Sequence, residues 1–170
     1  MIKGLLEQSD SILLRRTEVR DLDFVFTSEH SEENKMFVSQ QTINEHQKML
    51  LDGDILHLIV EEKSSRKSVG YVILAGFKNK NKSIELRRIV ITEKGKGFGR
   101  EAIKLCKVIA FEIEKAHRLW LDVRQHNKRA YNLYTSEGFV EEGTLRECVL
   151  NEGNFESLIV LSVLESEYKM

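Results

Sequence analysis

The sequence predicts an α+β fold, an α/β sandwich in which a mixed, largely antiparallel sheet of six to seven strands carries helices on both faces. Three observations support this prediction. Two short apolar runs separated by the charged segment 63–67 indicate a hairpin over residues 55–77. A strand, a glycine-rich loop, a long helix and another strand follow over residues 84–123, which is the order of a parallel βαβ unit. Two further apolar runs, which we expect to form strands, follow Gly138.

The individual elements follow from hydrophobic periodicity and from turn residues. Apolar runs and alternation predict strands at residues 12–16, 55–61, 69–77, 84–91, 119–123, 139–142 and 155–164. Apolar residues at helical spacing predict helices at residues 21–29, 44–51 and 100–115, and a short helix that Asn127 opens and that ends before Gly138. Thr42 or Asn44 is expected to cap the second of these helices.

Composition restricts the classes of function. The 170 residues fit one domain, taken as residues 1–170, and 41% apolar with 31% charged residues is typical of a soluble globular protein. A formal net charge of −1 provides no basic field for nucleic acid, and no apolar run approaches the roughly 20 residues that span a bilayer. We find no signal-peptide pattern and no zinc spacing between the two cysteines. We therefore expect a cytoplasmic protein that binds neither nucleic acid nor membrane.

A glycine-rich loop joins the strand of the βαβ unit to its helix. Residues 94–100 read Lys-Gly-Lys-Gly-Phe-Gly-Arg. Glycines allow a ligand to approach the backbone, and successive N–H groups at a helix start form an anion site that suits a pyrophosphate. Lys94, Lys96 and Arg100 would add positive charge. The simpler alternative for this loop alone is a flexible turn without a ligand.

Two other phosphate-binding loops fit less well. A P-loop requires GxxxxGK followed by Ser or Thr, whereas Gly97 follows Gly95-Lys96 here. A dinucleotide fingerprint, GxGxxG, requires a small third residue, and Arg100 takes that position when the motif starts at Gly95. Asp122 lies at a suitable sequence distance for a ribose contact. A nucleotide-dependent dehydrogenase is therefore weakened but stays an alternative.

Two motifs, in the right order, resemble the signatures of the GNAT N-acetyltransferase superfamily. Residues 94–99 are similar to the R/Q-x-x-G-x-G/A loop that holds the coenzyme A pyrophosphate in that family. Residues 127–139 are similar to its second signature, N-x-x-A-x-x-L-Y-x-x-x-G-F. The resemblance covers residues 11–165 and is closest to the ribosomal-protein N-acetyltransferase (RimJ/RimL) and spermidine acetyltransferase branches. Lys94 replaces the usual Arg or Gln, which keeps a positive donor but loses the planar fork.

The resemblance implies the GNAT fold and an N-acetyltransferase that moves the acetyl group of acetyl-CoA to a primary amine. The acceptor would be a small amine, a polyamine or a protein N-terminus, attacking directly through a tetrahedral intermediate without a metal ion. The branch resemblance favours a homodimer. The implied coenzyme contacts come from Ile89, Val90, Ile91, Lys94, Gly95, Lys96, Gly97, Phe98, Gly99, Arg100, Asn127, Ala130 and Tyr134.

The same resemblance assigns two catalytic candidates. Tyr134 would lie beside the coenzyme sulfur and protonate the leaving thiolate, although a phenol pKa near 10 lies above a thiol pKa near 8.5, so we expect a partial contribution. Glu85 would act as the base, through a water molecule. Simpler roles exist for each: Tyr134 could pack on an amphipathic helix, Glu85 could pair with Arg87 on the same strand face, and Asn127 could serve only as a cap.

An acidic segment, residues 28–34, connects the first two predicted helices. Its carboxylates, Glu29, Glu32 and Glu33, would attract a cationic acceptor such as a polyamine, and a solvated acidic turn is an equal alternative. For the whole chain, the alternative function is a non-catalytic acetyl-CoA-binding module of the same fold.

Overall fold

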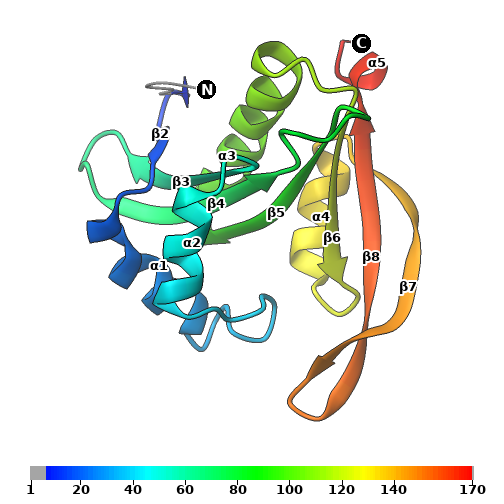
Figure 1. Ribbon diagram of the computed structural model, residues 1–170, viewed down its shortest axis with the longest axis horizontal. Coiled ribbons are helices and arrows are strands. Elements are labelled where there is room, and N and C mark those ends of the chain that lie inside the picture. Colours follow the sequence, from blue (N-terminus) through cyan, green and yellow to red (C-terminus); the bar gives the residue numbers. More distant parts are fainter. Residues whose placement is uncertain (1–6, 170) are drawn as a thin grey trace.

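The computed structural model describes residues 7–169, and in that range eight strands form one sheet in the order β1-β2-β3-β4-β5-β6-β8-β7 (Figure 1). Neighbouring strands are antiparallel except for β5 and β6, which are parallel. The predicted mixed sheet and the parallel βαβ unit are thus confirmed.

The strands are β1 (Glu7–Gln8), β2 (Ile12–Arg16), β3 (Ile55–Glu62), β4 (Ser68–Ala75), β5 (Ser83–Ile91), β6 (Arg118–Arg124), β7 (Val140–Asn151) and β8 (Asn154–Leu164). The helices are the 3-10 turn η1 (Val19–Asp21), α1 (Leu22–His30), α2 (Ile43–Leu51), α3 (Phe98–Lys107), the π-helix η2 (Val108–Ile113), α4 (Lys128–Ser136) and α5 (Glu165–Tyr168).

Several elements differ from the sequence prediction. The sheet has eight strands where six to seven were predicted, because the two-residue strand β1, too short to show a pattern, pairs with β2, and the short helix α5 was also not predicted. The strand expected at residues 139–142 continues to Asn151 and forms a long hairpin with β8, because pairing resumes at Val149 after an irregularity. Most of β7 is exposed and only one edge of it is paired, so burial leaves no clear alternation in its sequence. The helix predicted at residues 100–115 starts earlier, at Phe98, and changes to a π-helix at Val108. Figure 1 shows the far end of the hairpin extending beyond the rest of the sheet.

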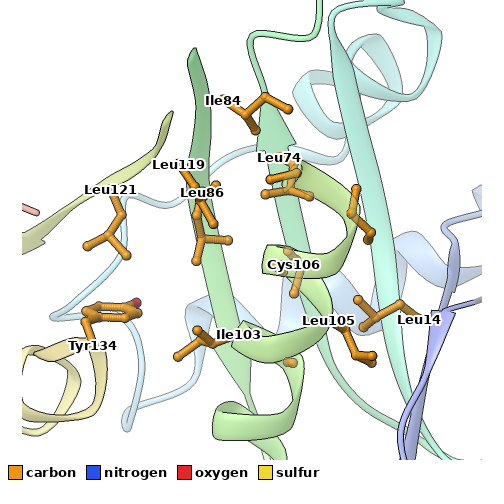
Figure 2. Packing of buried hydrophobic residues seen from close by; sticks show 14 of the residues in the cluster. Leu14, Leu74, Ile84, Leu86, Ile103, Leu105, Cys106, Leu119, Leu121 and Tyr134 are labelled. Carbon is orange, nitrogen blue, oxygen red and sulfur yellow. The ribbon is translucent and has the colours of Figure 1, made fainter. Parts of the chain in front are cut away.

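Apolar side chains pack on both faces of the sheet. The larger cluster lies between the sheet and helices α3 and α4, and Figure 2 shows Ile103, Leu105 and Cys106 of α3 against the strands. Cys106 is fully buried, as the apolar stripe of its helix predicts. The smaller cluster packs beneath α1 and α2 around Ile59 and Ile73. The two helix pairs therefore cover opposite faces, and the open end of the sheet lies between them.

Helix ends follow the predicted capping chemistry. Thr42 Oγ1 accepts a hydrogen bond from the Glu45 N–H at 3.2 Å, and the Glu45 carboxylate accepts one from the Thr42 N–H at 2.7 Å. At α4, the Asn127 side chain accepts from the Ala130 N–H at 3.2 Å. Gly138, with φ of +89°, follows the C-terminal end of α4. Within residues 7–169, no helix is both long and apolar enough to span a membrane.

Candidate active site

The central strands β5 and β6 pair only at one end. Their register covers Ser83 to Glu85 against Arg118 to Trp120. Beyond that point the pairing of β5 is with β4 alone, and a bulge at Arg87 shifts the β4–β5 register. The edge of β5 that faces β6 therefore has N–H and C=O groups without a strand partner in the described part of the chain. A cavity of about 900 Å³ lies at this opening.

The cavity brings most of the predicted site together. Every residue in the predicted catalytic and coenzyme-binding set lines it, with one exception. Lys96 lies outside the lining because its ammonium pairs with Glu93 and lies 3.8 Å from Glu62 Oε1. Its Nζ lies over the Phe98 ring, 5.7 Å from the ring centroid. Lys96 is thus the one residue of the predicted set that does not line the cavity, and its contact with the coenzyme stays a prediction.

The glycine loop leaves the start of α3 open. Gly95 and Gly97 have φ values of +84° and +82°, which an L-residue adopts only with strain. Gly97 is the N-cap of α3 and supplies no side-chain acceptor, so the first-turn N–H groups remain available to a ligand. An uncapped helix start carries partial positive charge. These features fit the pyrophosphate of an acyl-CoA.

The predicted cations around the loop are partnered by carboxylates. Lys94 Nζ lies 3.4 Å from Glu33 Oε2. Arg100 pairs with Glu137, a residue at the end of α4 that also accepts a hydrogen bond from Lys107 Nζ on its backbone oxygen at 2.8 Å. These contacts tie α3 to α4 and hold Arg100 at the cavity wall.

Tyr134 lies on α4 with its side chain turned into the core. The residue is only 7% exposed, and its ring centroid lies 5.8 Å from that of Phe139. Figure 2 shows the phenol between α4 and the strands, near Leu121. Burial raises the pKa of the phenol above its ordinary value, and the negative charge of Asp122 adds to this effect. The phenol therefore stays protonated at neutral pH, as a proton donor requires.

Glu85 and Arg87 form the ion pair that their spacing predicts. Arg87 Nε and Nη2 lie 3.0 and 2.9 Å from Glu85 Oε2. Glu85 still lines the cavity, but its Oε2 atom is occupied by both contacts to the Arg87 guanidinium.

Asp122 is a cavity carboxylate to which the sequence assigned only a ribose contact. It lies on β6, two residues beyond the last pair with β5. Within residues 7–169 its carboxylate makes no hydrogen bond and no ion pair within 4.0 Å, although the positive charge of Arg124 also acts on it. Partial burial, with a smaller contribution from the Glu85 charge, raises the pKa of its carboxyl. Because both strands carry a carboxylate where they diverge, the splay places Glu85 and Asp122 in one cavity. The parallel pairing of Glu85 with Trp120, two residues before Asp122, is the feature that brings the two carboxylates together.

The segment between α1 and α2 forms the opposite wall. Asn34, Phe37, Val38 and Ser39 line the cavity from this side. The Phe37 ring lies 5.6 Å from the His126 ring, which belongs to the loop after β6. The acidic residues expected here lie elsewhere: none of Glu29, Glu32 and Glu33 lines this cavity, and Glu29 is completely buried.

Comparisons with known proteins agree with this architecture. A family model for the acetyltransferase (GNAT) domain matches residues 11–140. Spermidine N(1)-acetyltransferase from Vibrio cholerae is 33% identical over 110 residues, an alignment that covers 64% of this chain and 64% of that protein, slightly less than two thirds of its length.

Solved structures are similar over nearly the whole chain. A dodecameric spermidine N-acetyltransferase from Vibrio cholerae is 27% identical, with a TM-score of 0.80 over 94% of this chain and 97% of that one. A spermidine/spermine N-acetyltransferase from the same organism, in complex with manganese ions, is also 27% identical, with a TM-score of 0.79 over 94% and 95% of the two chains. The family match, together with this fold and cavity, shows that the chain belongs to the GNAT acetyltransferase family.

Proposed function

We propose that this protein transfers the acetyl group of acetyl-CoA to a primary amine, and that its acceptor is a polyamine. The observation that carries the proposal is one cavity lined by two kinds of group. One is the open start of α3 with its positive-φ glycines, and the other is the set of Tyr134, Glu85 and Asp122. The first suits a diphosphate, and the second suits acid–base chemistry on an amine.

The chain offers acetyl-CoA two kinds of contact. The backbone N–H groups from Gly95 to Gly99 and the Arg100 side chain would bind the pyrophosphate. The unpaired edge of β5 at Ile89 to Ile91 would hydrogen-bond the pantetheine arm as an added strand does. The same N–H groups would stabilise the negative charge that grows on the thioester carbonyl oxygen during attack.

The acceptor nitrogen must lose a proton and the coenzyme sulfur must gain one. Asp122 is the better placed carboxylate for the first step, because it has no ion-pair partner and its pKa is raised, whereas Glu85 is paired with Arg87. Tyr134 keeps its proton at neutral pH and would donate it toward the departing sulfur. A water molecule between the carboxylate and the amine is compatible with this arrangement.

The polyamine assignment rests on charge and on similarity. Arg87, Arg88 and Arg124 line the acceptor half of the cavity, yet each is paired, with Glu85, Glu29 and Glu156 respectively. Asp122 is then the carboxylate left to attract a cation. The relatives reported above carry names of spermidine acetyltransferases, which supports the same acceptor class.

Two measurements test the proposal. Acetyl-CoA at ~100 times its Kd should add ~2.7 kcal/mol to the free energy of unfolding, while NAD should give no shift. Release of coenzyme A should then be measured with spermidine, an amino acid, an aminoglycoside and an N-terminal peptide, and we expect the highest kcat/KM with spermidine. Binding without turnover of any amine would favour the non-catalytic acetyl-CoA-binding module, and a shift with NAD alone would overturn the assignment.

We also propose that the β7–β8 hairpin mediates self-association. Leu145 and Leu150 of β7 and Phe155 of β8 are 50%, 64% and 66% exposed, which is unusual for large apolar residues on one hairpin. A solved relative is dodecameric, so the assembly of this chain could exceed the homodimer expected from the sequence. Light scattering of the purified protein, with Phe155→Ser as the variant, tests this surface.

A further inference from the structure

A buried charge cluster lies next to the cavity wall formed by residues 34–39, the acceptor wall, and takes no part in the proposed proton transfers. Its centre is Glu29, at the end of α1, whose side chain is completely buried. Burying a carboxylate is strongly unfavourable unless it is paired and hydrogen-bonded. The groups that surround Glu29 therefore indicate which parts of the structure its charge holds together.

Four partners from four segments converge on the Glu29 carboxylate. Oε2 accepts hydrogen bonds from the Tyr71 hydroxyl of β4 at 2.7 Å and from Arg88 Nη1 of β5 at 2.8 Å. Oε1 accepts one from the Gln41 N–H at 2.6 Å and lies 3.2 Å from His46 Nε2 on α2. Burial alone would raise the pKa of Glu29, but the nearby His46 ring, the hydrogen bonds from the Tyr71 hydroxyl and the Gln41 N–H, and the charge of Arg88 lower it, so the group is ionised.

The cluster continues away from the cavity through two histidines. His46 Nδ1 lies 3.2 Å from His57 Nε2, and His57 Nδ1 lies 2.8 Å from Thr17 Oγ1. The ring of His57 also stacks on Tyr71, with centroids 5.5 Å apart. These contacts fix the ring that faces Glu29 and make the cluster a rigid base for the wall above it.

Two members of the cluster reach the acceptor wall directly. Arg88 lines the cavity although its side chain is only 9% exposed, and its Nη1 also donates to the Gln41 side-chain oxygen at 3.2 Å. Gln41 follows the wall segment 34–39, so its N–H bond to Glu29 anchors the end of that segment. At the start of the segment, the Asn34 side chain donates to the Ser28 carbonyl at 2.9 Å. Glu29 therefore joins the wall to β5, the strand that carries the bulge.

We infer that Glu29 and Arg88 form a latch that positions the acceptor wall against β5 and neutralises Arg88 at the cavity surface, so that a cationic acceptor can bind. This inference rests on the proposed function. Glu29 touches no substrate and acts through Arg88 and Gln41, so it is a positioning residue. Without its charge, the buried guanidinium would repel an ammonium group, and segment 34–39 would lose the anchor at its end.

The test compares Glu29→Gln with a matched control. Glu61→Gln removes another carboxylate that is only 5% exposed and ion-paired, with Arg15 Nε at 2.7 Å. Neither of its ion-pair partners, Arg15 and Arg66, lines the cavity, whereas Arg88, the partner of Glu29, does. We expect Glu29→Gln to raise the KM for spermidine tenfold or more and to leave the KM for acetyl-CoA within twofold. Amide hydrogen exchange of residues 31–42 should become faster in Glu29→Gln and stay unchanged in Glu61→Gln.

Two further variants keep the inference open to refutation if Glu29→Gln folds poorly. Arg88→Lys keeps the charge but loses the planar fork, so it should give a smaller rise in spermidine KM together with faster exchange in residues 31–42. The double variant Glu29→Gln/Arg88→Gln removes both charges and should recover part of the spermidine affinity.

The outcomes separate this inference from the proposed function. If folded Glu29→Gln and Arg88→Lys keep the wild-type spermidine KM and exchange rates, or if Glu61→Gln gives the same KM split, the latch is wrong. If the wild-type protein releases no coenzyme A with any amine, the proposed function is wrong, and the exchange rates alone still decide whether Glu29 anchors the wall.

Discussion

The two walls of the cavity are built in different ways. The wall formed by α3 and α4 rests on a continuous apolar cluster and presents the open N–H groups of a helix start. The wall between α1 and α2 rests on buried charges, with Glu29 and Arg88 at the centre. Under the proposed function, the first wall would bind the acetyl donor and the second would contact the acceptor. The difference teaches that the two walls of one cavity depend on separate physical interactions.

The largest expected difference between the two walls is how strongly the free energy of unfolding depends on acid pH. Burial, with neighbouring His46 and Arg88, lowers the pKa of His57 to about 3, whereas the ordinary value in an unfolded chain is about 6.5. Between these values the unfolded chain binds a proton that the folded protein does not, so stability falls as the pH drops below about 6.5. From pH 7 to pH 5 this group alone should remove about 2 kcal/mol.

Urea unfolding at both pH values checks this prediction. His57→Gln should reduce the loss of stability between pH 7 and pH 5, and His117→Gln, which alters an exposed histidine, should not. If wild type and His57→Gln lose the same free energy of unfolding between pH 7 and pH 5, the acid sensitivity arises outside the α1–α2 wall.

The next effect tests the chemistry of the α4 side. Tyr134→Phe should lower kcat at least tenfold, which corresponds to about 1.4 kcal/mol, with little change in the KM for acetyl-CoA. Tyr131→Phe is the matched control, since Tyr131 lies on the same helix but bonds Glu141 outside the cavity lining. Steady-state kinetics of both variants decide the matter, and an unaltered kcat in Tyr134→Phe removes the phenol from the mechanism.

A comparison of Asp122 with Glu85 tests which of the two cavity carboxylates accepts the proton from the amine. The acidic limb of the kcat/KM profile should reflect protonation of the base, because a protonated carboxyl cannot accept a proton from the amine. Asp122→Asn should lower kcat/KM about tenfold, by roughly 1.4 kcal/mol, and abolish that limb. Glu85→Gln should keep the limb. The opposite result would restore Glu85 as the base and leave Asp122 as an electrostatic contact.

The smallest effect concerns the backbone of the glycine loop. Gly97→Ala should cost about 1 kcal/mol through its φ of +82° and raise the KM for acetyl-CoA roughly fivefold. Gly153→Ala imposes similar strain, with φ of +80°, in the hairpin turn far from the cavity lining. Thermal unfolding should show the same destabilisation in both variants, and only Gly97→Ala should weaken acetyl-CoA binding.

The sequence predicted the α3–α4 wall well and the α1–α2 wall poorly. The glycine loop and the helix opened by Asn127 are contiguous segments, so local spacing was enough to identify them. The Glu29 cluster draws on residues from α1, α2, β3, β4 and β5, and local sequence reads Glu29 as part of a charged turn. Its burial is a property of long-range packing, as is the placement of Asp122 opposite Glu85.

The sequence did not predict the length of β7, because an exposed edge strand needs no apolar alternation to pair. It also did not predict that the Lys96 ammonium pairs with carboxylates outside the cavity lining, because that pairing depends on the fold of the loop. Segment 139–142 was correctly placed because Phe139 is buried beside Tyr134.

The short parallel seam between β5 and β6 has a consequence for how the molecule comes apart. Within residues 7–169, three residue pairs form the strand pairing between one half of the sheet, β1 to β5, and the other half, β6 to β8, while the apolar cluster under α3 and α4 spans both halves. Such a narrow junction makes each half a candidate cooperative unit of partial opening, in the sense that hydrogen exchange detects foldons. A thioester donor bound along this junction would contact both units. Binding would therefore make the two units open together, and their amide hydrogens would then exchange at similar rates.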